Sequence, residues 1–140
     1  MKVIVISGAC SNIGKTTVAR RLQSLLERAT FVKIGHGDVR PEISNRLYPM
    51  GTSFETIREN HADAEWLLIE SNAILLEIQP DLLIYMDGPN PKPSAKEARV
   101  RADIVSGLCV DRDSVTTLAA RLGITVELTR QIVEIAGGKL

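Results

Sequence analysis

Cysteine, aromatic side chains and an excess of either charge are all scarce in this chain of 140 residues. Its two cysteines, Cys10 and Cys109, lie far apart in the sequence, which is unlike a disulfide framework and favours a reducing compartment. Five aromatic residues (one Trp, two Tyr and two Phe) offer few surfaces on which the bases of single-stranded nucleic acid could stack. The 17 basic residues balance 17 acidic ones, so no overall field attracts the chain to nucleic acid or to an anionic membrane. We therefore expect neither nucleic acid nor a membrane among its partners.

Long apolar runs are also missing from the sequence. The first apolar segment begins at Lys2 and leads directly into residues with the character of a binding site, so we expect no removable signal and no membrane anchor. The length of the chain suits one hydrophobic core. We accordingly expect a single domain over residues 1–140 and a cytoplasmic protein.

What the sequence does contain is a loop rich in small residues that ends in Gly14-Lys15-Thr16. It follows the apolar run of residues 3–6 and precedes a helical pattern, which is the strand–loop–helix context of a phosphate-binding loop. Backbone N–H groups of such a loop converge on phosphates at the positive end of the helix dipole. We expect Lys15 to add a point charge for the outer phosphates and Thr16 to offer its hydroxyl to Mg²⁺. The expected nucleotide-binding residues are Gly8, Ala9, Cys10, Ser11, Asn12, Ile13, Gly14, Lys15, Thr16 and Thr17.

The spacing of this loop departs from the commonest pattern. Four residues usually separate the first glycine from the Gly-Lys pair, which places Ala9 where a glycine is common, whereas Gly8 lies one residue earlier. Either the first glycine is replaced or the loop is a longer variant. A plain strand-to-helix turn of small residues is the alternative, but it does not account for Lys15 and Thr16 at the start of an apolar-periodic helix.

Short apolar segments alternate with helical patterns along most of the chain. We predict strands over residues 2–7, 30–34, 66–69, 82–86 and 102–105, and helices over residues 15–28, 52–60, 73–78, 94–101, 113–122 and 126–136. Residues 38–51 are predicted to be a loop. This alternation favours an α/β fold of three layers (α/β/α) around a mostly parallel sheet. Ligands of such sheets bind beyond the carboxyl ends of the strands.

Acidic side chains follow three predicted strands at that edge of the sheet: Asp38 after the second, Glu70 after the third and Asp87 after the fourth. Mg²⁺ usually takes one or two protein carboxylates and keeps several waters. We predict that Thr16, Glu70 and Asp38 hold Mg²⁺. The predicted catalytic residues are Lys15, Glu70 and Asp38. The alternative is that these acids merely end strands at the solvent boundary.

Residues 111–140 are predicted to form a C-terminal helical pair that packs against the sheet. The spacings of these helices also occur in helix-turn-helix motifs. A DNA-reading unit needs positive side chains that contact phosphates, but here four basic residues are matched by four acidic ones. We therefore predict a structural role for this pair.

With the Gly-x5-Gly-Lys-Thr loop of residues 8–16, the chain resembles P-loop NTPases of the signal-recognition, MinD and dethiobiotin synthetase class. Within that class it is most similar to the adapter family of molybdopterin-guanine dinucleotide biosynthesis. Residues 32–36 match a family strand that ends in lysine and histidine, and residues 68–70 match a strand that ends in glutamate. Ser71 replaces the family's usual glycine after that glutamate. The resemblance covers roughly residues 2–105 and does not account for the helical pair.

The resemblance implies Mg²⁺-dependent binding and slow hydrolysis of a purine nucleoside triphosphate, ATP or GTP, by an adapter in cofactor biosynthesis. A cofactor-biosynthesis protein and a second copy of the chain, in a homodimer, are the protein partners left open. Two other functions also remain. One is a small-molecule kinase or ATP-dependent ligase, whose acceptor pocket would be formed by residues 38–60 and the basic segment of residues 92–101. The other is a nucleotide-gated binding module without turnover.

Overall fold

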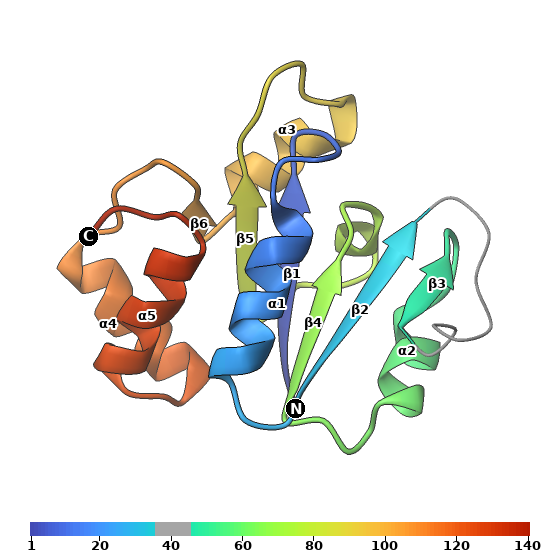
Figure 1. Cartoon of the computed structure of the whole chain (residues 1–140), viewed down its shortest axis with the longest axis horizontal. Coiled ribbons are helices and arrows are strands. Elements are labelled where there is room, and N and C mark those ends of the chain that lie inside the picture. Colours follow the sequence, from blue (N-terminus) through green and yellow to red (C-terminus); the bar gives the residue numbers. More distant parts are fainter. Residues whose placement is uncertain (36–45) are drawn as a thin grey trace.

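The computed structural model describes residues 1–35 and 46–140, which have a mixed α/β architecture (Figure 1). The strands in these residues are β1 (Lys2–Gly8), β2 (Ala29–Gly35), β3 (Leu47–Pro49), β4 (Trp66–Glu70), β5 (Leu82–Met86) and β6 (Ile104–Val105). The helices are α1 (Lys15–Leu25), α2 (Phe54–Asn60), α3 (Pro93–Arg101), α4 (Arg112–Leu122) and α5 (Val126–Ile135), with a 3₁₀-helix η2 (Ala73–Leu76). None of the helices described here is long and apolar enough to cross a membrane.

All six strands are parallel and form one sheet in the order β3-β2-β4-β1-β5-β6. β1 lies between β4 and β5, so that Ile4 faces Leu68 on one side and Leu82 on the other. Parallel strands are buried on both faces, which explains why these segments are almost continuously apolar. The predicted α/β fold with a mainly parallel sheet is confirmed. Because the strands are parallel, the residues that follow them gather at one edge.

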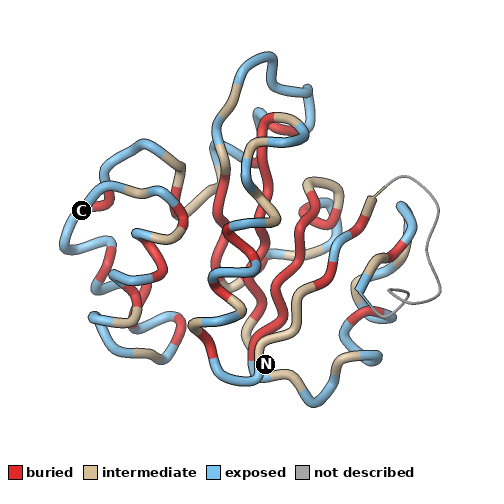
Figure 2. Tube along the Cα trace, viewed as in Figure 1, coloured by how far each residue is buried: buried red, intermediate tan, exposed pale blue. Residues whose placement is uncertain are grey.

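Two apolar clusters hold helices against the two faces of the sheet, and buried residues run along its strands (Figure 2). In β1, Ile4 and Ile6 belong to one cluster and Val3 and Val5 to the other, as the two-residue period of a strand requires. Side chains from α1, α4 and α5 join the first cluster, and side chains from α2, η2 and α3 join the second. The core therefore lies on both sides of the strand that carries the glycine-containing loop.

Two predicted helix boundaries are wrong by a few residues for reasons of backbone chemistry. α1 ends three residues before the predicted position, because Leu26 is extended and Arg28 adopts a left-handed φ of 52°. α2 begins two residues after the predicted position, because Ser53 is its N-cap and the Ser53 hydroxyl accepts a hydrogen bond from the N–H three residues later. Both helices otherwise lie within the residue ranges predicted for them.

The strand β3 falls in a region that we predicted to be a loop. It pairs with β2, where Lys33 faces Leu47 and Gly35 faces Pro49. Three residues are too few to show an alternating pattern, and proline is tolerated here because β3 is an edge strand. The segment predicted as a helix over residues 73–78 is only the short η2, and β6 has two residues instead of four.

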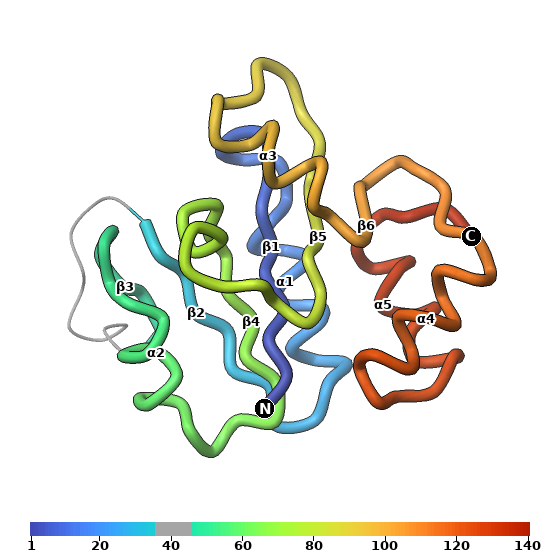
Figure 3. The backbone as a smooth tube through the Cα atoms, turned by 180° about the vertical axis from the view of Figure 1, so that it is seen from behind, coloured from blue at the N-terminus to red at the C-terminus, as the bar shows by residue number. Residues whose placement is uncertain are grey.

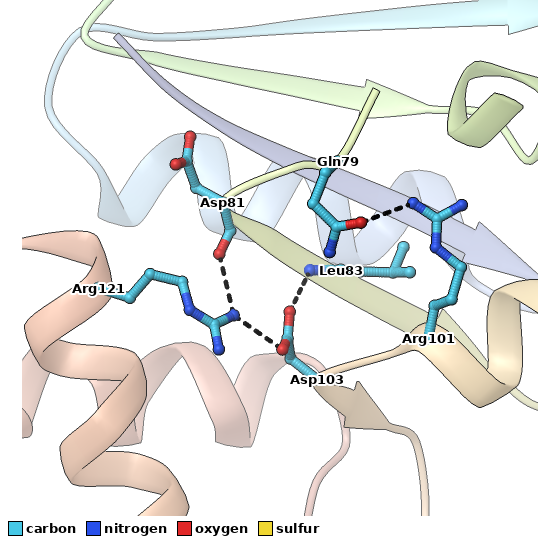
Figure 4. Close-up of polar contacts among 6 residues, drawn as sticks. All are labelled: Gln79, Asp81, Leu83, Arg101, Asp103 and Arg121. Atoms are coloured by element: carbon cyan, nitrogen blue, oxygen red, sulfur yellow. Dashed lines mark hydrogen bonds and ion pairs between the residues drawn. The ribbon is translucent and has the colours of Figure 1, made fainter. Parts of the chain in front are cut away.

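The C-terminal helices α4 and α5 pack on the same face of the sheet as α1 (Figures 1 and 3). A polar network also ties them to the amino ends of the strands (Figure 4). Arg121 of α4 donates a 2.8 Å hydrogen bond to Asp103, whose second carboxylate oxygen accepts a 2.9 Å bond from the Leu83 N–H. Arg121 also reaches the Asp81 carbonyl at 3.4 Å. Two helices thus occur within residues 111–140, and this tether lies at the edge opposite to the loop after β1.

Candidate functional site

Residues 9–14 connect β1 to α1 at the carboxyl edge of the sheet. Gly14 precedes the helix with a φ of 98° and a ψ of 10°, a left-handed conformation that favours glycine. Asn12 is also left-handed, with a φ of 60°. Because Gly14 has no side chain with which to cap α1, the first backbone N–H groups of the helix are available to an anion.

The packing favours a glycine at position 8 rather than at position 9. A Cβ atom on Gly8 would lie 2.8 Å from Ile13 Cδ1, so that the Ile13 side chain would have to move, and a tight 3.2 Å from the Met86 carbonyl oxygen. Ala9, in contrast, is fully buried in an apolar cluster and donates its N–H to the Met86 carbonyl at 3.0 Å. The loop is therefore the longer of the two variants that the sequence allowed, with Gly8 as its first glycine.

Asn72, two residues after the end of β4, holds the start of the loop. Its side-chain oxygen accepts a 3.0 Å hydrogen bond from the Gly8 N–H, and its side-chain nitrogen donates a 3.0 Å bond to the Gly8 carbonyl. The side chain thus pairs with β1 in the manner of one further strand residue. We did not predict this role; the available signal was an amide side chain two residues after the acid that ends β4.

Thr16, Glu70 and Lys33 meet in one chain of polar contacts. The Thr16 hydroxyl donates a 2.6 Å hydrogen bond to Glu70 Oε1, and Lys33 Nζ lies 3.1 Å from Glu70 Oε2. Glu70 is buried, with 4% of its surface exposed, whereas the Lys33 side chain is about half exposed. The two predicted Mg²⁺ ligands Thr16 and Glu70 are therefore adjacent, and Lys33 is a neighbour that we had not assigned to the site.

Lys15 lies within the electrostatic reach of the same groups. Its partial burial lowers the pKa of its ammonium below the usual lysine value, and the nearby Lys33 and Lys92 lower this pKa further. The carboxylate of Glu70 opposes them by favouring the charged form of Lys15. Lys15 thus has two neighbouring lysines and one buried carboxylate within electrostatic reach. Such an excess of local positive charge suits a polyanionic ligand.

These residues border a cavity of about 990 Å³ at the carboxyl edge of the sheet. The loop contributes residues 11–17, and Lys33 and residues 70–73 line the cavity from the neighbouring strands. On the other side, α3 begins beside the loop, where the Lys92 N–H donates a 3.1 Å bond to the Ala9 carbonyl. Its residues extend the cavity beyond the loop; those that line it are Ser94, Glu97, Ala98 and Arg101.

The structure places the predicted loop residues in two groups. Residues 11–17 line the cavity, whereas Gly8, Ala9 and Cys10 shape the loop from behind. Among the predicted catalytic residues, Lys15 and Glu70 come together. Asp38 lies outside the residues that the structure describes.

Asp87 and Arg101, the first an acid that follows a predicted strand and the second part of the basic segment of residues 92–101, bind partners of their own within the protein. Asp87 does not line the cavity and instead pairs with Arg99 at 3.5 Å. Arg101 lines the cavity, but its guanidinium donates to the carbonyls of Leu75 and Ile78. It also donates to the Gln79 side chain (Figure 4). Arg101 therefore fixes η2 and the segment after it against α3.

The sequence matches no protein-family model and no curated protein. What the site can hold therefore follows from its own donors. No cluster of three or more histidine, cysteine, aspartate or glutamate side chains occurs within residues 1–35 and 46–140. Mg²⁺ needs fewer, since it takes one or two protein oxygens and completes its octahedron with water and phosphate. The Thr16 hydroxyl and the Glu70 carboxylate, both hard oxygen donors, fit that requirement.

Proposed function

We propose that the chain binds a purine nucleoside triphosphate with Mg²⁺, ATP or GTP, and hydrolyses it slowly. The observation that carries this proposal is the 2.6 Å contact between Thr16, at the start of the helix after the glycine-containing loop, and Glu70, at the end of the adjacent strand. A hydroxyl and a carboxylate brought together beside a helix N-terminus match the needs of a phosphate-bound Mg²⁺. On this proposal the sheet and its helices are a three-layer P-loop NTPase fold.

Each residue of the site has a distinct part in this function. Backbone N–H groups of residues 11–17 bind the phosphate oxygens, and Lys15 places its ammonium against the outer phosphates. Thr16 and Glu70 hold Mg²⁺, which when bound neutralises charge that develops on the phosphates. The Glu70 carboxylate accepts the Thr16 hydroxyl bond and would also hold the metal, so it is a weak acceptor for a proton from water. This supports slow rather than rapid turnover.

The biological setting rests on the resemblance described above. We propose an adapter in cofactor biosynthesis, in the cytoplasm, whose partner is a biosynthetic enzyme of that pathway class or a second copy of the chain. Residues 111–140 then form part of the same single domain, without a role in nucleic-acid binding.

A second candidate function is a small-molecule kinase or ATP-dependent ligase. The cavity favours it because about 990 Å³ is at the upper end of the range for ligand pockets and extends past the loop along α3. Ser94 and Glu97 line that extension and offer polar groups to a second substrate. The third candidate function is a nucleotide-gated binding module without turnover.

One experiment separates these functions. ATP, GTP and a pyrimidine triphosphate are titrated against the protein with and without Mg²⁺, and the unfolding temperature is recorded, because a ligand that binds only the native state raises it. The proposal expects stabilisation by ATP or GTP that is stronger with Mg²⁺, followed by slow release of inorganic phosphate. Nucleotide binding with no phosphate release favours the binding module, and release that depends on an added acceptor favours the kinase or ligase. No stabilisation by any nucleotide contradicts the proposal.

A further inference from the structure

Lys33 occupies an unusual place in the site, because it reaches the buried carboxylate from a strand that does not carry the loop. β2 and β4 are neighbours, and their register sets Lys33 directly opposite Glu70. The backbone of Lys33 is fixed on its other side as well, since its N–H donates a 2.7 Å bond to the Arg46 carbonyl. The position of the lysine is thus determined by the sheet, while its half-exposed side chain lines the cavity and retains freedom to move.

The pairing of Lys33 with Glu70 meets an electrostatic need of the protein in the absence of metal. A carboxylate that is 4% exposed is costly unless its charge is compensated. The Thr16 hydroxyl supplies a hydrogen bond to one oxygen, and Lys33 brings a full positive charge to within 3.1 Å of the other. A metal ion bound to Glu70 would supply that charge instead.

Building on the proposed nucleotide function, we propose that Lys33 is an internal substitute for Mg²⁺ at Glu70. In the absence of metal, its ammonium neutralises the carboxylate and limits the repulsion between Glu70 and the triphosphate. When Mg²⁺ binds, Lys33 leaves Glu70 Oε2, and the flexible four-carbon side chain permits this movement without a change in the sheet. Lys33 therefore sets how strongly nucleotide binding depends on Mg²⁺.

Replacing Lys33 by a neutral residue should weaken nucleotide binding in the absence of Mg²⁺. Without the ammonium, Glu70 loses its direct ion pair and keeps the charge of Lys15 alone among the lysines that line the cavity close to it, so binding of the metal-free nucleotide weakens. Binding of the Mg²⁺ complex changes little, because the metal neutralises the same carboxylate. The ratio of the two dissociation constants, measured in EDTA and in saturating Mg²⁺, should rise about tenfold in Lys33→Met, in line with the coupling energies of directly contacting groups.

The test compares the wild type with Lys33→Met and Lys33→Gln, which remove the charge, and with Lys33→Arg, which keeps it. The control is Lys96→Met, since Lys96 is an exposed lysine of α3 outside the cavity. ATP and GTP are titrated in EDTA and in Mg²⁺. We expect the ratio to rise in the two neutral variants and to stay near the wild-type value in Lys33→Arg and Lys96→Met. In a Glu70→Gln background the effect of Lys33→Met should vanish, because no carboxylate is left to compensate.

A second measurement needs no nucleotide. Mg²⁺ alone should raise the unfolding temperature of Lys33→Met more than that of the wild type, because in the variant the metal replaces a missing charge. If Lys33→Met does not fold, both measurements are made on Lys33→Gln, whose amide can still donate a hydrogen bond to Glu70 and so help the variant to fold.

The outcomes separate this inference from the proposed function. A wild type that binds nucleotide, with an unchanged ratio in the neutral variants, overturns the substitute role and leaves the nucleotide function standing. A wild type that binds no nucleotide under either condition overturns the proposed function. In that case the response to Mg²⁺ alone decides the role of Lys33, and an equal shift in variant and wild type overturns it.

Discussion

The hydroxyl of Thr16 and the carboxylate of Glu70 are 2.6 Å apart, although 54 positions separate them in the sequence. α1 supplies the first and β4 the second, and β4 is the immediate neighbour of the strand from which the loop leaves. This pairing places a hydroxyl and a carboxylate beside each other at the cavity, which Lys15, Lys33 and Lys92 also line.

Lys15→Ala should weaken nucleotide binding itself. A hydrogen bond to a charged group contributes about 1.5–3 kcal/mol, so the dissociation constant should rise roughly 10- to 100-fold. Lys15 is partly exposed at the cavity, so the variant should remain folded. Calorimetric titration with the Mg²⁺ complexes of ATP and GTP measures the effect, and Lys96→Ala is the matched control. Wild-type affinity in a folded Lys15→Ala protein would remove the phosphate-binding role of the loop.

Glu70→Gln should slow turnover while leaving most of the nucleotide affinity. The amide keeps the shape of the side chain and can still accept the Thr16 hydroxyl bond, but it cannot hold Mg²⁺ as a carboxylate does. Loss of a charge-positioning group in a pre-organised site commonly costs on the order of a hundredfold in rate. Single-turnover hydrolysis, with circular dichroism as the folding control, checks this. Equal rates in variant and wild type would exclude Glu70 from the reaction.

Asn72→Ala should loosen the loop from behind. The variant leaves both the N–H and the carbonyl of Gly8 without their side-chain partner, and an unsatisfied buried group costs about 1–3 kcal/mol. We expect a lower urea midpoint, faster exchange of the Gly8 amide and weaker nucleotide binding. Asn60→Ala, which removes a single 3.2 Å bond to the Tyr48 hydroxyl, serves as the control. An Asn72→Ala protein with wild-type exchange at Gly8 contradicts the role given to Asn72.

Gly8→Ala should destabilise the protein more than Ala9→Gly does. The first places a methyl group 2.8 Å from Ile13 Cδ1, and such overpacking costs about 1–3 kcal/mol. The second removes one buried methyl group, costs about 1 kcal/mol and should leave nucleotide binding in place. Urea unfolding and nucleotide titration of both variants test the assignment of the first loop glycine. If Ala9→Gly were the more damaging change, that assignment would be wrong.

Local patterns were sufficient to predict most elements and part of the site. The apolar periodicity of α1 and the Gly-Lys-Thr ending of the loop can be recognised in contiguous residues. The structure also places Lys15 and Glu70 at one cavity. The same holds for the strand over residues 82–86, which matches β5. The elements depend on interactions within one segment, and the meeting of Lys15 and Glu70 follows from the rule that parallel strands share a carboxyl edge, so the sequence alone indicates both.

The contributions of Asn72 and Lys33 depend instead on tertiary register. Asn72 reaches Gly8 only because β4 lies beside β1, and Lys33 meets Glu70 only because β2 lies beside β4 at a particular alignment. No local pattern states which strands are neighbours, so neither residue could be assigned from its surroundings in the chain. The strand β3 was missed for a similar reason, since its three residues become a strand through pairing with β2.

The strand order also determines the stage of folding at which Thr16, Lys33 and Glu70 can form their contacts. Thr16, Lys33 and Glu70 belong to α1, β2 and β4, and all three elements are together only when β4 lies between β1 and β2, although β2 precedes β4 in the chain. Such an insertion closes long loops and is slow compared with helix formation. A collapsed intermediate with α1 already formed would therefore have a helix N-terminus but no metal-binding pair. Affinity for the Mg²⁺ complex of a nucleotide should recover late in refolding, together with the sheet, and so report on completed native topology.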